Sequence, residues 1–229
     1  MENKEKRYAI IVAGGKGARM GAAIPKQFLL LSGKPLLMHT LEAFYQADPE
    51  INMILVLPDS QQHYWKELCT KYNFKLPCRI ANGGETRFES VQNGLALTES
   101  DGLVAVHDGV RPFINAALIE RCYAAAEQFG AAVPVTELTE SIRRLDGETS
   151  FSVHRETYRS VQTPQAFRTE LLKKAYLLPY RESFTDDASV VEASGFKVEL
   201  VEGYPENIKI TTTLDLLLAE EMKKLNPRL

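Results

Sequence analysis

Residues 8–28 read YAIIVAGGKGARMGAAIPKQF, and this stretch decides the fold. The apolar run 8–13 has the length and composition of a buried strand. Glycines that permit a tight turn, and let an anion approach bare backbone amides, end this run at Gly14, Gly15 and Gly17. Three cations belong to the same short segment: Lys16, Arg19 and Lys26. A strand, a glycine turn and clustered cations together predict a polyphosphate site.

Two common glycine motifs fit this segment poorly. The dinucleotide fingerprint G-x-G-x-x-G would need a glycine at Met20, and the acidic residue that it expects about 20 positions further on would be Glu42, inside a helix-like stretch. The P-loop G-x-x-x-x-G-K-[ST] fits neither Gly15-Lys16 nor Gly33-Lys34, because both pairs lack the first glycine and the following Ser or Thr. The segment is therefore a nucleotide loop of a third kind.

The composition is that of a globular protein without a basic surface. The chain has 229 residues, 45% hydrophobic and 25% charged, enough for one large α/β domain or one domain with an arm. A formal net charge of −3 argues against nonspecific nucleic-acid binding. No run of about 18 apolar residues is present, so we expect no membrane span. The charged N-terminus leads straight into a strand and not into a secretory signal, so we expect a cytoplasmic protein.

Cysteine and histidine, the usual ligands of soft metals, are scattered along the chain. Three cysteines at these positions make neither a disulfide framework nor a C-x-x-C motif, and the four histidines show no ligand spacing. Any metal is therefore expected to be Mg²⁺, held by carboxylate and phosphate oxygens.

Apolar runs alternate with helical periods along most of the chain. Strands are expected at 8–13, 51–57, 78–81, 103–106, 130–135 and 196–201. Helices are expected at 35–47, from Ser60 through Tyr72, and at 87–97, 116–129, 168–178, 186–193 and 214–225. This alternation predicts an α/β fold, a doubly wound and mostly parallel sheet with helices on both faces, in a single domain over 1–229.

The alternation breaks at 136–158, a polar stretch without a helical period. A turn at Asp146-Gly147, flanked by strand-like residues, predicts a long β-hairpin that projects from the domain. A structureless loop of this length would be unusual. Such an arm has little core of its own and needs a surface to lie against, so we expect a homodimer in which it contacts a second copy.

Ligands of a doubly wound sheet bind beyond the carboxyl ends of the strands. Six distinctive loops fall at those ends: 14–26, 82–87 with Ser90 one turn later, 106–113, 162–167, 184–189 and 206–211. We therefore expect these loops to build the binding site.

As a set, the motifs in these loops are specific. They read A-G-G-x-G-x-R-M-G with P-K-Q, then H-D-x-x-R-P, T-P-Q-x-F, T-D-D-A-S and N-I-K-I-T. With this set the chain resembles the 2-C-methyl-D-erythritol 4-phosphate cytidylyltransferase family of Rossmann-like nucleotidyltransferases over residues 8–213. One departure is Gly109, where the family usually has alanine; this small change leaves backbone contacts possible.

The resemblance implies that CTP and a polyol phosphate react to give a CDP-polyol and pyrophosphate. The implied catalytic residues are Arg19, Lys26, Arg155 and Lys209. Arg19 and Lys26 would stabilise the five-coordinate phosphorus and the departing pyrophosphate, while Lys209 would reach the α-phosphate and the attacking phosphate. Arg155, on the arm, would bind the substrate phosphate in the neighbouring subunit's site. Asp108 would hold Mg²⁺ against the triphosphate oxygens.

The same resemblance implies the binding residues. Those for the nucleotide are Ala13, Gly14, Gly15, Gly17, Gly83, Gly84, Glu85 and Ser90, of which the last four would read cytosine largely through backbone groups. Those for the polyol phosphate are Arg111, Arg155, Thr163, Thr185, Asp186 and Lys209. Thr185 and the pair Asp186-Asp187 lie where the family contacts polyol hydroxyls, and Arg111 would brace the Asp108 loop or the substrate.

Purely structural interpretations of these residues stay open at this point. Arg19, Lys26, Arg155 and Lys209 could all be solvated surface charges. Asp108 could cap the helix that follows it, and Asp186-Asp187 could begin a helix. His107 is expected to be packed or hydrogen-bonded and not to act as a base.

Three other functions compete with the one implied. A ribitol-5-phosphate cytidylyltransferase would share the motifs and differ in the residues lining the polyol pocket. A dehydrogenase would use the glycine loop for a dinucleotide, which Met20 argues against. A noncatalytic nucleotide sensor would bind CTP and release no pyrophosphate.

Overall fold

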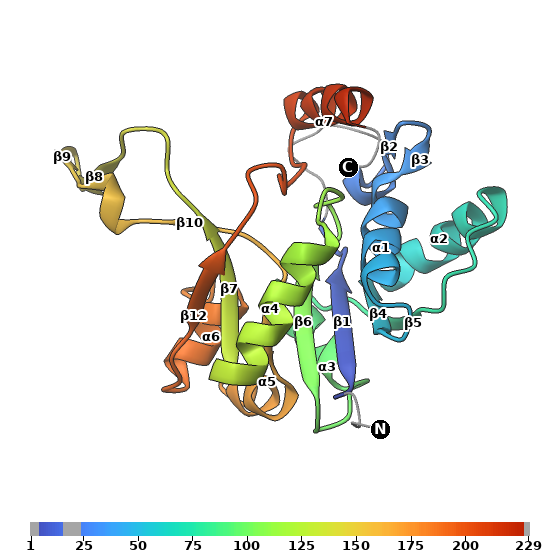
Figure 1. The fold of residues 1–229 in the computed structure, drawn as a ribbon, viewed down its shortest axis with the longest axis horizontal. Coiled ribbons are helices and arrows are strands. Elements are labelled where there is room, and N and C mark those ends of the chain that lie inside the picture. The colour runs from blue at the N-terminus through green and yellow to red at the C-terminus, as the bar shows by residue number, and fades with distance from the viewer. Residues whose placement is uncertain (1–4, 16–23, 227–229) are drawn as a thin grey trace.

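A computed structural model describes residues 5–15 and 24–226 of the chain. Gly17 and Arg19 of the glycine loop lie outside the described residues. An eight-stranded sheet forms the centre, in the order β10-β7-β11-β6-β1-β4-β5, with β12 pairing with β7 (Figure 1). Its strands are β1 (Arg7–Val12), β4 (Asn52–Leu57), β5 (Arg79–Asn82), β6 (Leu103–Asp108), β7 (Ala131–Thr136), β10 (Ser160–Val161), β11 (Gln165–Arg168) and β12 (Glu199–Glu202).

Helices cover both faces of the sheet, so the central strands are buried on both sides. In β1, Ala9 and Ile11 face one hydrophobic cluster, while Tyr8 and Ile10 face the other. The first cluster is closed by α1 (Leu36–Ala47), α2 (Asp59–Lys71) and α4 (Ala116–Phe129). The second is closed by α3 (Arg87–Leu95), α5 (Thr169–Ala175) and α6 (Asp187–Ala193). The predicted doubly wound α/β fold is confirmed.

The sheet is parallel at its centre and mixed at one side. Strand β1 pairs in parallel with β4 and β6, β4 pairs in parallel with β5, and β12 pairs in parallel with β7. Strand β11 was not predicted; it lies antiparallel between β6 and β7. Because it runs against β6, its first residue Gln165 pairs with Val106, and the preceding Thr163 reaches the carboxyl end of β6.

The predicted arm is a hairpin of β8 (Arg143–Asp146) and β9 (Thr149–Ser152), and Figure 1 shows it projecting from the sheet. Gly147 turns it with φ of 56°, in the left-handed region that favours glycine. A short 3₁₀ turn, η3 (Arg155–Thr157), follows and carries Arg155. The hairpin exposes Leu145 and Phe151. It therefore has little core of its own, as expected.

The C-terminal helix α7 (Thr213–Leu225) joins two segments that carry predicted site lysines. One segment is η2 (Lys26–Phe28) with the small hairpin of β2 (Leu30–Leu31) and β3 (Lys34–Pro35). The other leads from Lys209 into Ile210, which packs in one cluster with Leu31 and Ala219. None of the described helices is long and apolar enough to cross a membrane.

Candidate functional site

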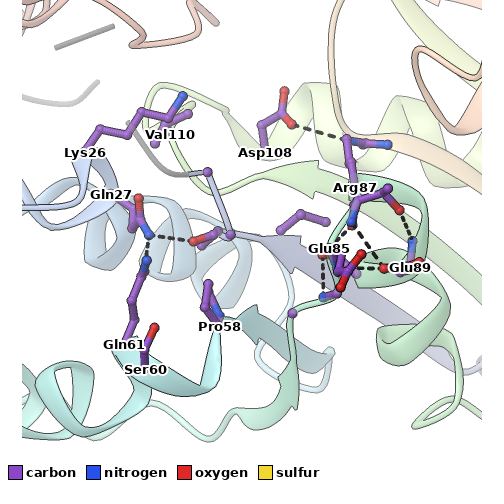
Figure 2. Close-up of a pocket in the computed structure, with 18 of the residues that line it drawn as sticks. Lys26, Gln27, Pro58, Ser60, Gln61, Glu85, Arg87, Glu89, Asp108 and Val110 are labelled. Carbon is purple, nitrogen blue, oxygen red and sulfur yellow. Dashed lines mark hydrogen bonds and ion pairs between the residues drawn. The ribbon is translucent and has the colours of Figure 1, made fainter. Parts of the chain in front are cut away.

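A pocket of about 1290 Å³ opens at the carboxyl ends of β1, β4, β5 and β6 (Figure 2). Parallel strands place the loops that follow them at one edge of the sheet, which is why residues far apart in the sequence meet here. Of the residues predicted from the sequence, ten line this pocket: Ala13, Gly14, Gly15, Lys26, Gly83, Gly84, Glu85, Ser90, Asp108 and Lys209. The structure thus brings together most of the expected nucleotide residues.

Gln27 anchors the loop that follows β1 through hydrogen bonds of its side chain. Its side chain is 1% exposed, and its amide nitrogen donates to the Ala13 carbonyl at 2.6 Å and to the side chain of Gln61 at 2.5 Å (Figure 2). The backbone amide of Ala13 in turn donates to Val56 in β4. The neighbouring Lys26 lies over the glycine turn, since a Cβ on Gly15 would be 3.3 Å from Lys26 Cε. Lys26 is therefore held at the wall of the pocket.

The second loop is a rigid turn at the start of α3. Thr86 caps the helix, and Glu89 reaches back to the backbone amides of Thr86 and Glu85, forming a capping box. The Ser90 hydroxyl accepts the Gly84 amide at 3.0 Å and donates to the Thr86 carbonyl at 2.9 Å. Ser90 thereby shapes the turn, and the exposed residues Gly84 and Glu85 line the pocket.

Asp108, at the end of β6, is surrounded by cations. Its Oδ2 lies 2.9 Å from Lys209 Nζ and 3.3 Å from Arg111 Nε, and its Oδ1 lies 3.9 Å from Arg87 Nε. Burial alone would raise the pKa of this carboxyl, but Lys209, Arg87 and Arg111 outweigh burial and hold the pKa far below its ordinary value. The carboxylate is therefore ionised at neutral pH. It does not cap the next helix, because Asn115 caps α4.

A buried hydrogen-bonded chain holds Asp108 in place. The Asp108 amide donates to Thr163 Oγ1 at 3.1 Å, and this oxygen lies 3.1 Å from His107 Nδ1. Because the Arg111 carbonyl, 3.2 Å from Nε2, can only accept, the neutral imidazole donates from Nε2, and its Nδ1 accepts the Thr163 hydroxyl. His107 is fully buried, and burial lowers its pKa to about 4. As expected, His107 is a hydrogen-bonded structural residue.

This histidine predicts a pH dependence of stability. The pKa of His107 is about 4 in the folded protein, against 6.5 ordinarily, so only the unfolded chain binds a proton between these values. The contribution of neutral His107 is complete above pH 6.5 and is lost as the pH falls to about 4, an expected loss of about 3 kcal/mol in unfolding free energy. Urea unfolding at several pH values should show this slope in the native protein and a flatter slope in His107→Gln. A matched change at the exposed His63, His63→Gln, should keep the native slope; identical slopes in all three proteins would contradict the assignment.

Arg111 and Asn207 complete the frame around Asp108. Arg111 donates from a terminal nitrogen to the Asn207 carbonyl at 2.7 Å, and Asn207 donates from its side chain to the Thr163 carbonyl at 2.8 Å. A second pocket of about 860 Å³ lies beside the first and shares Lys209 with it. Its lining includes Arg111, Thr136, Arg159, Gln162, Asn207 and Lys209. Lys209 thus stands where two pockets meet.

Four predicted substrate residues line neither of the two pockets: Arg155, Thr163, Thr185 and Asp186. Asp186 caps α6 through Ser189 and accepts the Gln165 amide at 2.8 Å, so its expected helix-starting role is confirmed. Thr185 is exposed beside it, and the hydroxyl of Thr163 serves His107 and Asp108. Arg155, on the arm, is half exposed and donates to the Thr139 carbonyl of its own chain.

Arg87 and Gln27 were missed as site residues by the sequence reasoning. Arg87 lines the first pocket, and its terminal nitrogen lies 2.6 Å from Asp187, a residue 100 positions away. No sequence pattern separates it from a surface arginine at a helix start. Gln27 could have been found, because it stands beside Lys26 in the P-K-Q motif.

The fold and this site define a nucleotidyltransferase of the Rossmann-like type: a glycine turn, a strand-end carboxylate and lysines line one pocket at the carboxyl edge of the sheet. A family model described as IspD, 2-C-methyl-D-erythritol 4-phosphate cytidylyltransferase, matches residues 8–224. The chain belongs to this family.

Individual relatives agree with the family match. The 2-C-methyl-D-erythritol 4-phosphate cytidylyltransferase of Phocaeicola vulgatus is 57% identical over 93% of this chain and 98% of its own, and that of Bacteroides thetaiotaomicron is 55% identical over 95% and 99%. Among solved structures, the enzyme of the same name from Thermus thermophilus matches with a TM-score of 0.76 at 35% identity, over 96% and 99% of the two chains. The 4-diphosphocytidyl-2C-methyl-D-erythritol synthase of Anaerococcus prevotii matches with a TM-score of 0.81 at 28% identity, over the same shares.

Proposed function

We propose that the chain transfers CMP from CTP to 2-C-methyl-D-erythritol 4-phosphate, which gives 4-diphosphocytidyl-2-C-methyl-D-erythritol and pyrophosphate in non-mevalonate isoprenoid precursor synthesis. One observation carries this function: Lys209 lies at the junction of two pockets, with Lys26 lining the first and Arg111 lining the second. The first pocket would take CTP and the second the polyol phosphate. We propose the cytoplasm as the compartment of this enzyme.

The attacking group in this reaction is a phosphate oxygen that is already anionic, so the reaction needs no general base. The low pKa of His107 agrees with that, because the buried imidazole is neutral and bonded on both nitrogens. What the reaction needs is positive charge, which holds two anions together and stabilises the charge gained by the α-phosphorus. Lys26 and Lys209 would supply it, with Arg19 as a third cation by the family resemblance.

Mg²⁺ is the metal that the site would take. Among the described residues there is no group of three or more His, Cys, Asp or Glu side chains that could hold a metal, so a metal would need ligands from the nucleotide. Mg²⁺ is commonly bound in this way, through one or two carboxylates and the phosphates of a substrate. Asp108 fits as the protein ligand, because it lines the pocket and is ionised. When bound, the ion would neutralise triphosphate charge.

Cytosine would be read by the turn at the start of α3. Gly84 and Glu85 line the first pocket beside the capping box, and Gly83 is tied to β4 through the Leu57 carbonyl. The backbone amides of Gly83, Gly84 and Glu85 donate within the protein, so the turn would offer its carbonyl oxygens as acceptors for the cytosine amino group. The turn of Ala13, Gly14 and Gly15 would lie against the phosphates and ribose.

The arm would complete the second pocket of a neighbouring copy. We propose one domain over 1–229 whose arm, 136–158, makes a homodimer and delivers Arg155 to the partner's polyol phosphate. Two features support this: Arg155 lies outside both pockets of its own chain, and the hairpin exposes the apolar side chains of Leu145 and Phe151. Thr185 and Asp186, at the start of α6, would border the same substrate.

Arg155→Ala should therefore raise the KM for the polyol phosphate more than the KM for CTP, because the removed charge binds one substrate only. Steady-state kinetics with each substrate varied in turn measure this difference. Arg143→Ala, on the same arm and bound to Ser150 of the hairpin, is the matched control. Equal increases in both KM values in Arg155→Ala would show that the residue is misplaced.

Pyrophosphate release tests the function itself. With CTP and Mg²⁺, we expect 2-C-methyl-D-erythritol 4-phosphate to react at least about tenfold faster than ribitol 5-phosphate, since a pocket shaped for a branched polyol discriminates by factors of this size. The reverse preference would make the chain a ribitol-5-phosphate cytidylyltransferase. CTP binding without pyrophosphate release would indicate a sensor, and tight NAD binding without CTP binding would indicate a dehydrogenase.

A further inference from the structure

We propose that Arg87 is a positioning residue of the reaction: anchored on the buried Asp187, it fixes the side of the Asp108 carboxylate that faces away from Lys209. The proposal rests on the proposed function, because it assigns Arg87 a task in orienting the Asp108 carboxylate for the transfer step.

The anchor is a carboxylate that is fully removed from solvent. Asp187 is 0% exposed, and each of its oxygens has a partner. One oxygen lies 2.6 Å from a terminal nitrogen of Arg87, and the other accepts the Tyr176 hydroxyl at 2.6 Å. Burial raises the pKa of Tyr176 well above its ordinary value, so the phenol stays protonated and remains a donor. Asp187 is thus held on both sides and cannot contact a substrate hydroxyl.

The Nε side of the Arg87 guanidinium lies toward Asp108 in the first pocket. Arg87 is the first residue of α3 and follows the turn of Gly83, Gly84 and Glu85, here called the cytosine turn. Its Nε lies 3.9 Å from Asp108 Oδ1 (Figure 2). Lys209 and Arg111 approach the opposite oxygen, Oδ2. The carboxylate is therefore held between cations on both of its oxygens. A rotation of the carboxylate would lose these contacts on both sides.

A structural role alone explains the pair poorly. Only the carboxylate of this pair is fully buried, the Arg87 side chain being 30% exposed, and an ion pair with a buried partner seldom adds net stability, because removing charge from water costs about as much as the attraction returns. Replacing such pairs with well-packed apolar side chains of similar volume is often neutral or stabilising. The pair instead joins three loops of the site: the cytosine turn, the start of α6 and the end of β6. Arg87 is the one described side chain that contacts Asp187 and Asp108 together.

Two single variants and their combination test the proposal. Arg87→Lys keeps the charge and loses the planar fork, and Asp187→Asn removes the anchor and leaves the arginine. We expect each to lower kcat about 10- to 100-fold, the cost of a catalytic group displaced by about 1 Å. The double variant should be no slower than the slower single variant, since both break one unit. Calorimetry should show a Kd for CTP within about threefold of the native value, because Arg87 acts on Asp108 and not on the nucleotide.

Arg168→Lys is the matched control, because this exposed arginine donates to the main-chain carbonyl of Glu127 and lies opposite Leu103, at the other end of β6 from Asp108. It should keep the native kcat. If thermal unfolding shows that Arg87→Lys and Asp187→Asn do not fold, Tyr176→Phe takes their place as the test, because it removes the other hydrogen bond to Asp187. We then expect a several-fold lower kcat at unchanged KM. The proposal is overturned by a native kcat in folded Asp187→Asn, by additive losses in the double variant, or by a CTP affinity that falls as much as kcat/KM. Pyrophosphate release by the native protein tests the proposed function separately from the role of Arg87.

Discussion

Replacing Lys26 or Lys209 with alanine should lower kcat by about 10²–10³-fold, the usual cost of removing one preorganised charge from a transition state. Both lysines line the CTP pocket, and Lys209 also borders the second pocket. Their charges are needed most when the α-phosphorus is five-coordinate. The loss should therefore appear in kcat more than in KM.

Neither lysine belongs to the hydrophobic core, so both variants should fold. Lys26 is half-buried over a glycine turn, and Lys209 is 41% exposed beside Asp108. Lys66→Ala, at an exposed position of α2, is the control and should keep the native kcat. Pyrophosphate release measures the rates, and circular dichroism monitors the fold. Turnover near the native rate in both lysine variants would count against their assigned roles.

Gly84→Ala should raise the KM for CTP about tenfold or more, since each 1.4 kcal/mol of lost binding is a factor of ten. A Cβ at this position would lie 2.3 Å from Glu89 Cβ and 2.9 Å from one of the Glu89 carboxylate oxygens. That carboxylate holds the capping box, so the turn and its backbone groups must move. Kinetics with CTP as the varied substrate measure the effect.

Gly94→Ala is the matched control on the same helix. Its Cβ would lie 2.7 Å from Ile10 Cγ2, in the core and away from the pocket. We expect it to lower stability by about 1–3 kcal/mol through overpacking and to leave the KM for CTP unchanged. If both alanines change the KM equally, the effect belongs to general destabilisation and the role given to the turn is wrong.

The sequence predicted the parts of the site that are local. Residues 8–15 show a strand and a glycine turn within a few positions, and 116–129 show a helical period whose bounds the structure reproduces in α4. The loops that follow the strands were placed at one edge by a general property of parallel sheets. Each of these inferences needs only neighbouring residues or a rule of topology.

Contacts between residues far apart in the chain could not be predicted from the sequence. Strand β11 has four residues between a proline and a helix, too few to show a period, and its place beside β6 is set by packing. The pair of Arg87 and Asp187 joins residues 100 positions apart. Asp187 looked like a substrate contact beside Asp186, yet its burial depends on how α6 packs against α3 and α5. A single sequence carries no signal for such pairs.

A crystal structure with CTP and Mg²⁺ tests the central claim most directly, which is that cations from distant loops converge on one triphosphate. We expect Lys26 Nζ and Lys209 Nζ within hydrogen-bonding distance of phosphate oxygens, Asp108 beside the metal, and cytosine against the turn of Gly83 and Gly84. Lysines pointing into bulk water, away from a bound CTP, would contradict the account.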